Sequence, residues 1–236
     1  MSRAKRSSAE AAAPASPPLE SPIDVARLAA IYTNTAAFYD GLAAQHQAAA
    51  KLAALDLLAR RPRERFLEAG AGTGWAFSRL VTSSGIDNAV ALDAAEGMLA
   101  VARQRLQTEA SLNHGPFLLA DLRAMPFLDS TFDCLLSSYT FEVLPTRDIT
   151  CALEEAWRVL RPGGRLVCVN LTEGSAEDAA ITDYWKERFK SDPESFGGAR
   201  PLQLAPAFEH AGWDQLTRSY IAGSWPSEVI RALRPQ

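Results

Sequence analysis

The residues most able to do chemistry are three alternating glycines, Gly70, Gly72 and Gly74, which follow an apolar run and the acidic Glu68. Because glycine has no Cβ, the backbone at such positions can turn sharply and let a ligand approach closely. Free N–H groups at the start of a following helix attract polar or anionic ligand atoms. The loop therefore predicts a small-ligand site, although a plain tight turn would use the same residues.

The spacing of this loop distinguishes between two classes of nucleotide-binding protein. A dinucleotide fold requires GxGxxG or GxGxxA, with a small sixth residue beside the pyrophosphate and the helix. Trp75 occupies that sixth position, and its indole would crowd both. The pattern favours a ligand without a pyrophosphate.

Two further acids follow the loop, each where an expected strand ends. Asp93 comes about 20 residues after the glycines, where a carboxylate accepts hydrogen bonds from both ribose hydroxyls. Asp121 ends the next strand and could accept from the exocyclic amine of adenine. Any one acid could be a cap or a solvated turn residue. Three of them at successive strand ends indicate the carboxyl edge of an open α/β sheet, where ligands bind.

Alternating strands and helices must position these acids. Residues 23–60 have a helical pattern that we expect to break into two helices near Asp40-Gly41. The chain that follows predicts an α/β fold with a doubly wound, mostly parallel seven-stranded sheet and an antiparallel C-terminal edge. The expected strands are 65–69, 89–93, 117–120, 132–138, 165–171, 215–222 and 228–233, and the expected helices are 75–81, 96–109, 147–160, 176–190 and 205–210. Residues 161–164 (RPGG) are expected to form a turn that no helix can continue through.

In order and spacing, these residues resemble a class I S-adenosylmethionine-dependent methyltransferase. The resemblance rests on Glu68–Gly74, Leu92–Leu99, Ala120-Asp121 with Met125–Phe127, Thr131–Asp133 and Leu160–Gly164. More narrowly, the chain is similar to the type 11 domain group, which includes the ubiquinone/menaquinone-biosynthesis C-methyltransferases. The resemblance implies a Rossmann-like methyltransferase fold and S-adenosyl-L-methionine as the cofactor, and it leaves the substrate open.

The resemblance also implies roles for individual residues. Those expected to contact the cofactor are Tyr39 in the N-terminal helices, Glu68 and Gly70 at the methionine end, Gly72 and Gly74 along the loop, Asp93 at the ribose, Ala94 and Met98 beside the adenine, Asp121 and the backbone of Leu122 at the adenine amine, and Ser137 and Ser138 facing the sulfonium. Met98 is equally well explained as an apolar helix position. We expect a disordered tail at 1–22 and one domain at 23–236, made of an N-terminal helical lid (23–60), a cofactor-binding core (61–172) and a substrate cover with edge strands (173–236).

Methyl transfer from a sulfonium requires the protein mainly to align the nucleophile and exclude water. A base is needed only where the nucleophile arrives protonated. Glu142, after the fourth strand, is a candidate base or substrate contact, with a helix-start acid as the alternative, and His46 could reach the same mouth. Trp185 and Arg200 are candidate substrate contacts in a C-terminal cover, unless they only pack the last elements. No metal site is expected.

The function predicted is S-adenosylmethionine-dependent methyl transfer to a small apolar or aromatic acceptor. A catalytically inactive cofactor-binding or scaffold protein of the same fold is the alternative, followed by an NAD(P)-dependent oxidoreductase, against which Trp75 argues. The sequence determines neither C-, O- or N-methylation nor the oligomeric state.

The composition excludes other classes of protein. Among the 236 residues, 47% are hydrophobic and 22% charged, which excludes a fully disordered chain. A net charge of −4 provides no basic field for nucleic acid, and no apolar run approaches the roughly 18–20 residues of a membrane span. Three cysteines without metal-type spacing fit a reduced compartment, so we expect a cytoplasmic protein. The basic residues near the N-terminus make organelle targeting a minor alternative.

Overall fold

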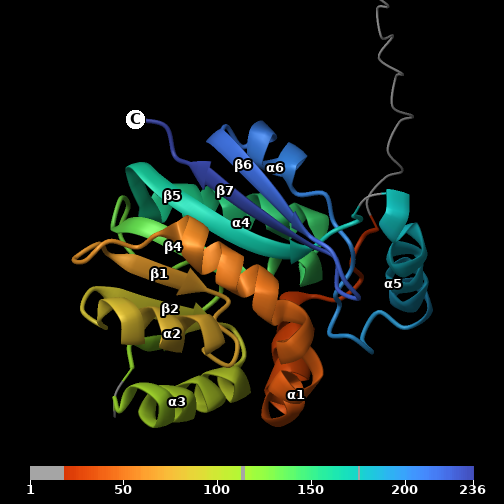
Figure 1. Cartoon of the computed structure of the whole chain (residues 1–236), viewed down its shortest axis with the longest axis horizontal. Coiled ribbons are helices and arrows are strands. Elements are labelled where there is room, and N and C mark those ends of the chain that lie inside the picture. Colours follow the sequence, from red (N-terminus) through yellow and green to blue (C-terminus); the bar gives the residue numbers. More distant parts are fainter. Residues whose placement is uncertain (1–18, 113–114, 175) are drawn as a thin grey trace, which may run out of the picture.

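A computed structural model of the chain describes residues 19–112, 115–174 and 176–236, and its strands form one sheet in the order β3-β2-β1-β4-β5-β7-β6. The strands are β1 (Phe66–Ala69), β2 (Ala89–Asp93), β3 (Phe117–Leu119), β4 (Phe132–Ser138), β5 (Leu160–Leu171), β6 (Asp214–Ile221) and β7 (Ser227–Leu233). The first five are parallel, whereas β7 runs antiparallel to β5 and β6 antiparallel to β7 (Figure 1). The predicted doubly wound sheet with an antiparallel C-terminal edge is confirmed.

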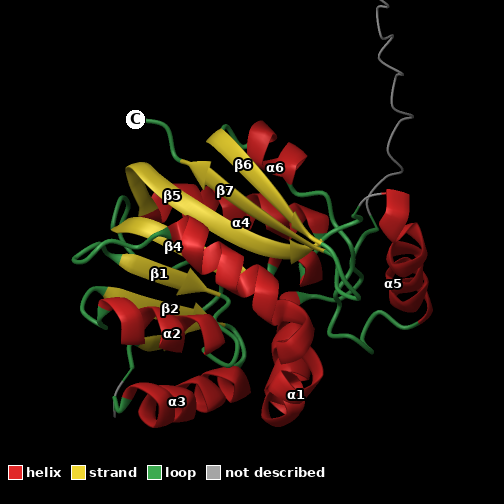
Figure 2. Ribbon diagram, in the orientation of Figure 1, coloured by secondary structure: helices red, strands yellow, loops and turns green. Residues whose placement is uncertain are grey.

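Helices cover both faces of the sheet (Figure 2). They are α1 (Val25–Leu58), α2 (Trp75–Ser84), α3 (Glu96–Ala110), α4 (Thr146–Val159), α5 (Ala179–Ser191) and α6 (Ala205–His210), with short 3-10 turns η1 (Phe141–Val143) and η2 (Ala176–Asp178). No helix in the described ranges carries an apolar stretch long enough to cross a membrane.

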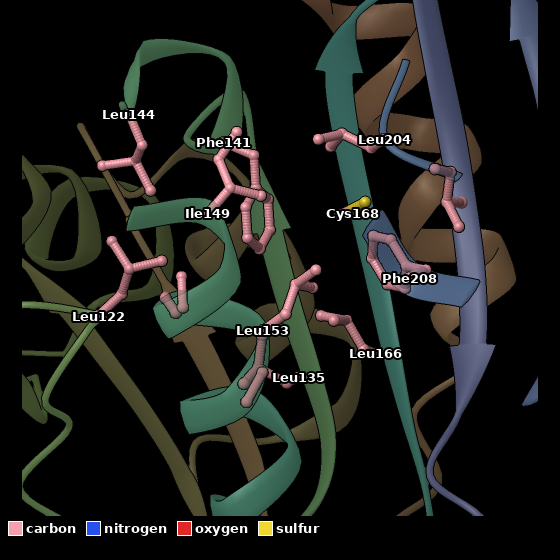
Figure 3. Packing of buried hydrophobic residues seen from close by; sticks show 14 of the residues in the cluster. Leu122, Leu135, Phe141, Leu144, Ile149, Leu153, Leu166, Cys168, Leu204 and Phe208 are labelled. Carbon is pink, nitrogen blue, oxygen red and sulfur yellow. The ribbon is translucent and has the colours of Figure 1, made fainter. Parts of the chain in front are cut away.

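Alternate residues of each central strand belong to different cores, as expected of a strand covered on both faces. Phe66 and Leu136 pack against α1, α2 and α3, whereas Leu67 and Leu135 pack against α4 and α6. Figure 3 shows the second core, in which Leu153 of α4 and Phe208 of α6 lie against strand residues. This two-sided burial makes the sheet a rigid support for its carboxyl edge.

The N-terminal helix differs from the prediction of two helices. Asp24 begins it by accepting a 2.7 Å hydrogen bond from the backbone N–H of Arg27, and the helix continues to Leu58 without ending at Gly41. A glycine inside a helix costs only about 1 kcal/mol, which packing on either side of it can offset. Figure 1 shows that α1 changes direction part-way along its length, so that it first crosses the carboxyl edge of the sheet and then lies over its face.

The turn expected at residues 161–164 is also revised. Helix α4 ends at Val159, one residue before the predicted end at Leu160. Strand β5 begins directly at Leu160, which pairs with Phe132 before a bulge shifts the register. Gly163 has a φ of 72° inside this stretch. Residues 161–164 therefore belong to the irregular first part of β5 rather than to a separate turn.

The expected tail also needs a correction. Residues 1–18 lie outside the described part of the chain, but residues 19–22 pack on the domain. The carbonyl of Leu19 accepts a 2.6 Å hydrogen bond from Arg200, and Glu20 accepts a 3.0 Å bond from the backbone N–H of Thr146. Ser21 is buried. The domain therefore begins before residue 23, because polar atoms of this short segment satisfy buried groups on two other elements.

Candidate functional site

The glycine loop lies between the ends of β1 and β4, where the strand order reverses. The N–H groups of Gly70 and Ala71 both donate to the carbonyl of Leu92 at 2.9 Å, which fixes the loop against β2. Gly70 has a φ of 76°, and a Cβ there would lie 2.2 Å from Oγ1 of Thr140. Gly72 has a φ of 54°, but a Cβ there would meet nothing within 4 Å. Gly70 therefore permits close packing against Thr140, whereas Gly72 faces open space.

Asp93 is held in place by the same loop. Its Oδ2 accepts a 2.7 Å hydrogen bond from the N–H of Gly72, and its Oδ1 accepts a 2.8 Å bond from the N–H of Ala95. Burial raises the pKa of Asp93, while hydrogen bonds from these backbone amides oppose the rise. A carboxylate has about four lone-pair sites, so each oxygen can still accept one further hydrogen bond.

A first cavity, of about 90 Å³, opens beside Asp93 at the carboxyl edge. It is lined by Val25, Leu28, Ala29, Tyr32, Tyr39, Gly70, Gly72, Leu92, Asp93, Ala94, Ala95, Met98, Ala120, Leu122, Ser138, Tyr139, Thr140, Val143 and Leu144. The structure thus brings together most of the predicted cofactor contacts, from Tyr39 on α1 to Ser138 on β4. The buried Oγ of Ser138 has no hydrogen-bond partner within the described residues, so it is available to a ligand.

Glu68 lies deeper than the cavity. It is 1% exposed, and its Oε2 lacks a partner among the residues that the structure describes. Burial raises the pKa of Glu68 to about 8, and the charge of Lys51 opposes this rise. Burial likewise lowers the pKa of Lys51 to about 8. Glu68 is therefore placed behind the loop rather than on the cavity wall.

Asp121 differs from the prediction. Its two oxygens bind the guanidinium of Arg123 at 2.6–3.1 Å, and Arg123 also binds Asp148 at 2.8 Å. Burial tends to raise the pKa of Asp121, but hydrogen bonds from Arg123 hold it below its ordinary value. Asp121 does not line the cavity, although its neighbour Leu122 does. A carboxylate already occupied by an arginine is a weaker candidate for reading an adenine amine than the sequence suggests.

Gly74 and Ser137 also lie off the cavity wall. Gly74 is the N-cap of α2, and it packs closely against Ala102 of α3. Ser137 is fully buried in β4, with its Oγ unpartnered within the described ranges. Since successive strand residues point to opposite faces, Ser137 and Ser138 cannot both face one cavity.

A second cavity, of about 290 Å³, adjoins the first. It is lined by Ile31, Tyr32, Thr35, Tyr39, Leu42, Ala43, Gln47, Tyr139, Glu142, Glu194, Ser195, Phe196, Gly197, Ala199 and Trp225. Three tyrosines, Tyr32, Tyr39 and Tyr139, line both cavities. The two cavities therefore share a wall of phenol rings.

Glu142 lines the second cavity and is 1% exposed. Burial raises its pKa to about 8, while hydrogen bonds from backbone amides and the charges of Arg200 and Lys51 oppose the rise. Its Oε2 has no hydrogen-bond partner in the described part of the chain. Glu142 is thus the predicted catalytic candidate that the geometry brings to the site.

The other candidates are placed differently. Arg200 is buried and donates to the carbonyls of Leu19, Glu142 and Leu144 at 2.6–2.8 Å. Its guanidinium therefore holds chain segments together. Arg200 lines neither cavity, although we expected it to contact the substrate.

His46 and Trp185 surround Trp225 rather than line the cavities. His46 is exposed, stacks on the Trp225 ring at 6.2 Å between centroids and contacts Ser224 Oγ through Nδ1 at 2.9 Å. Trp185 is 4% exposed, and its ring centroid lies 4.6 Å from that of Trp225 and 5.1 Å from that of Phe196. Neither His46 nor Trp185 lines a cavity, and both instead pack against Trp225, which lines the second cavity.

Tyr32 and Tyr139 are cavity residues that the sequence prediction missed, and it also missed Lys51, whose charge acts on Glu68. Tyr32 precedes Tyr39 by two helical turns, and their ring centroids lie 5.9 Å apart, so helical spacing could have indicated it. Tyr139 directly follows the predicted strand end, with a φ of 55° that is uncommon for a residue other than glycine. Lys51 gave no comparable signal, because its approach to Glu68 depends on how α1 packs.

The part of α1 that crosses the cavities is anchored beside Tyr39. Asp40 accepts a 2.8 Å hydrogen bond from Oγ1 of Thr73 in the glycine loop and pairs with Arg105 of α3. Arg105 also donates to the carbonyl of Thr73 at 2.9 Å. The helix that covers the site is therefore tied to the loop that forms its floor.

Comparisons with known proteins agree with this architecture. The sequence profile of a family described as "Methyltransferase domain" matches residues 66–164. The ubiquinone/menaquinone biosynthesis C-methyltransferase UbiE of Dinoroseobacter shibae is 36% identical over 148 residues, which are 61% of this chain and 58% of that protein. A malonyl-[acyl-carrier protein] O-methyltransferase from Serratia marcescens is 35% identical over 161 residues, covering 68% of this chain and 58% of that one. The chain thus spans less than two thirds of these relatives.

Solved structures share the fold at lower identity. The Haemonchus contortus phosphoethanolamine N-methyltransferase 2, solved with S-adenosylhomocysteine, has a TM-score of 0.61 and 14% identity over 79% of this chain and 52% of that chain. The [4+2]-cyclase SpnF has a TM-score of 0.61 and 19% identity over 80% of this chain and 82% of that chain. At such identities the likeness extends to the fold alone.

Proposed function

We propose that the chain, whose residues 66–164 match a methyltransferase domain, is a class I, S-adenosylmethionine-dependent methyltransferase that methylates a small apolar or aromatic acceptor. The observation that carries the proposal is the pair of adjoining cavities at the carboxyl edge of the sheet. One is lined by glycines of the loop and by Asp93, and the other is lined by Glu142 and five aromatic residues. A donor and an acceptor in these two places would meet at the tyrosine wall that both cavities share.

The residues of the first cavity fit the cofactor. The open space beside Gly72 admits a ligand against the backbone, and each oxygen of Asp93 keeps acceptor capacity for a ribose hydroxyl. Ala94, Met98 and Leu122 supply an apolar setting suited to adenine. S-adenosylmethionine, when bound, supplies a methyl group on a positively charged sulfur.

The chain itself positions the reactants and excludes water from them. Helix α1 covers both cavities with Tyr32 and Tyr39, and its attachment through Asp40 keeps that cover in place. Orientation of two reactants in this way can contribute about 7–11 kcal/mol to lowering a barrier. Glu142 is a buried group of the second cavity that can take or hold a proton.

Binding of the cofactor is the test of the proposal. Isothermal titration calorimetry of the full chain with S-adenosylmethionine and S-adenosylhomocysteine should give saturable binding, and NADH titrated under the same conditions should give none. Radiolabelled methyl transfer to a panel of phenols, quinols and amines then tests turnover. NADH binding without S-adenosylhomocysteine binding would support the oxidoreductase alternative and refute the proposal. Cofactor binding without transfer to any acceptor would favour the inactive alternative.

We also propose a small-molecule acceptor rather than nucleic acid, because the net charge of −4 does not favour a polyphosphate. The three cysteines are free thiols, with Cys134 and Cys168 buried and Cys151 exposed, which supports a cytoplasmic location. The relatives described above come from bacteria, and they give no support to organelle targeting.

A further inference from the structure

The charged residues that line the second cavity are all acidic. Two of its wall residues, Glu142 and Glu194, carry carboxyl groups, and no lysine, arginine or histidine of the described chain lines it. Its remaining wall is mainly aliphatic and aromatic. A cavity with this composition discriminates among acceptors by charge, because an anion would lose its hydration and meet carboxyl groups and neutral polar groups but no cationic side chain of the described chain.

The two carboxyl groups differ in availability. Glu194 is exposed and already forms a bidentate ion pair with Arg27 at 2.5–2.8 Å. Glu142 is 1% exposed, and its Oε2 lacks a hydrogen-bond partner within the described residues. A buried polar atom without a partner costs free energy, and a ligand that donates a hydrogen bond to it removes that cost. Glu142 therefore offers an acceptor to whatever occupies the cavity.

The nearest cations do not use this oxygen. Arg200 directs its guanidinium to three backbone carbonyls, one of which belongs to Glu142 itself. Lys51 lies beside the rings of Trp75 and Tyr139, 5.8 and 5.6 Å from their centroids. Neither cation lines the second cavity, whereas Glu142 is one of its wall residues.

Aromatic residues line the same cavity as Glu142. The wall includes Tyr32, Tyr39, Tyr139, Phe196 and Trp225. Aromatic faces are negative, and they attract an ammonium group within about 6 Å of a ring centroid. Rings together with Glu142, whose buried carboxyl group is ionised above its pKa of about 8, form a setting suited to a cation that carries an apolar body.

Resting on the proposed function, we propose that the second cavity binds a small amine carrying an aromatic or aliphatic group, and that its nitrogen is the atom methylated. The cavity of about 290 Å³ is at the lower end of the roughly 300–1,000 Å³ of small-molecule sites, which limits the amine to a single small ring or a short chain.

The reaction balances with the groups present. The amine enters as an ammonium and gives one proton to Oε2 of Glu142, which leaves a nitrogen lone pair. That lone pair forms the new N–CH₃ bond as the S–CH₃ bond breaks, and the electrons of the broken bond remain on sulfur. The positive charge thereby moves from sulfur to nitrogen, into the aromatic cavity where the rings and Glu142 stabilise it. A base is most effective when its pKa lies near the working pH, and the pKa of Glu142 is about 8.

Calorimetry at a pH above the Glu142 pKa of about 8, on the full chain saturated with S-adenosylhomocysteine, tests the charge preference. The probes are phenethylamine, its neutral analogue 2-phenylethanol and the anion 3-phenylpropionate, which share one ring and a similar length. We expect phenethylamine to bind at least tenfold more tightly than 2-phenylethanol, and 3-phenylpropionate to bind most weakly. In Glu142→Gln, which keeps the shape and removes the charge, the amine-to-alcohol ratio should fall to near one while the S-adenosylhomocysteine affinity is retained.

Glu154→Gln is the matched control, because Glu154 is an exposed residue of α4 outside both cavities. It should leave the amine-to-alcohol ratio unchanged. Equal or tighter binding of the alcohol or the anion, a ratio unaffected by Glu142→Gln, or failure of phenethylamine to bind the loaded protein would each overturn the proposal while S-adenosylhomocysteine still binds. Failure of S-adenosylhomocysteine itself to bind would instead remove the proposed function, and this inference with it.

Discussion

At the scale of single residues, Asp93 and Asp121 have the same position in the sequence pattern and different surroundings in the fold. Asp93 accepts from two backbone amides and faces the first cavity, whereas Asp121 is occupied by Arg123. An arginine two residues after an acid is not by itself a sign of pairing. The strand-end rule therefore locates both acids, and only the side-chain packing separates the acid that lines the cavity from the acid that pairs with an arginine.

This difference predicts the effect of Asp93→Ala. The substitution removes a charged acceptor for two hydroxyls and leaves the N–H groups of Gly72 and Ala95 without their partner. We expect affinity for S-adenosylhomocysteine to fall at least tenfold, measured by calorimetry. Asp87→Ala removes an exposed acid after α2 and should change nothing. Unaltered affinity in a folded Asp93→Ala protein would refute the ribose assignment.

The glycines of the loop predict two different defects. Both Gly70→Ala and Gly72→Ala force a side chain into a left-handed conformation, at a cost of about 1–2 kcal/mol. Gly70→Ala adds a clash with Thr140, so its urea midpoint should fall further than that of Gly72→Ala. Gly72→Ala directs its methyl into the first cavity and should weaken S-adenosylhomocysteine binding at least tenfold.

The double variant Gly70→Ala/Thr140→Ala separates clash from backbone strain. Removal of the Thr140 hydroxyl and methyl takes away the contacts at 2.2 and 2.7 Å, so part of the lost stability should return. No recovery would mean that backbone strain alone accounts for the defect.

At the scale of elements, the covering helix and the start of the domain could not be read correctly from local sequence. Gly41 weakens helix propensity, but Asp40 on one side pairs with Arg105 and on the other side Ala43 is buried. Likewise, residues 19–22 include only one large apolar side chain, Leu19, yet their polar atoms fit groups contributed by distant segments. Both errors arise because the stabilising partners lie far away in the chain.

Two truncations test the start of the domain. A chain without residues 1–22 loses the acceptor of Arg200 at Leu19 and the carboxylate that Glu20 places at the start of α4. Hydrogen bonds to charged groups contribute about 1.5–3 kcal/mol, so we expect its melting temperature to lie roughly 5–10 °C below that of a chain without residues 1–18, which keeps both contacts. Identical melting temperatures would show that these contacts contribute nothing.

At the scale of the whole molecule, the alternation of apolar runs and amphipathic segments was enough to predict the sheet, its antiparallel edge and the carboxyl edge as the ligand site. Helix and strand periodicity report burial on each element, and connection rules restrict how such elements assemble. The charged interior could not be predicted in this way. Lys51, Glu68 and Glu142 come from three different elements, and a chain with a net charge of −4 gives no sign that they are buried together.

That buried charge makes folding stability depend on pH, and Glu68→Gln isolates one contribution. The pKa of Glu68 rises from its ordinary 4.5 to about 8 on folding, chiefly through burial. Between these values the folded chain keeps a proton that the unfolded chain has released, so this group makes stability fall as the pH rises. Glutamine keeps the shape without titrating. The variant should therefore match the parent near about pH 5 and become progressively more stable than it toward about pH 8, in melting temperatures followed by circular dichroism.

The exposed Glu154→Gln serves as the control for this experiment, because its difference from the parent should stay flat over the same range. Lys51 contributes with the opposite dependence, since its pKa of about 8 lies below its ordinary 10.5 and its burial cost is relieved only above about pH 8. Removal of the Glu68 charge lowers the pKa of Lys51 further, so any change that it causes lies at the alkaline end. A Glu68→Gln difference that does not grow between about pH 5 and 8 would mean that Glu68 is charged in the folded protein, paired with Lys51 rather than protonated.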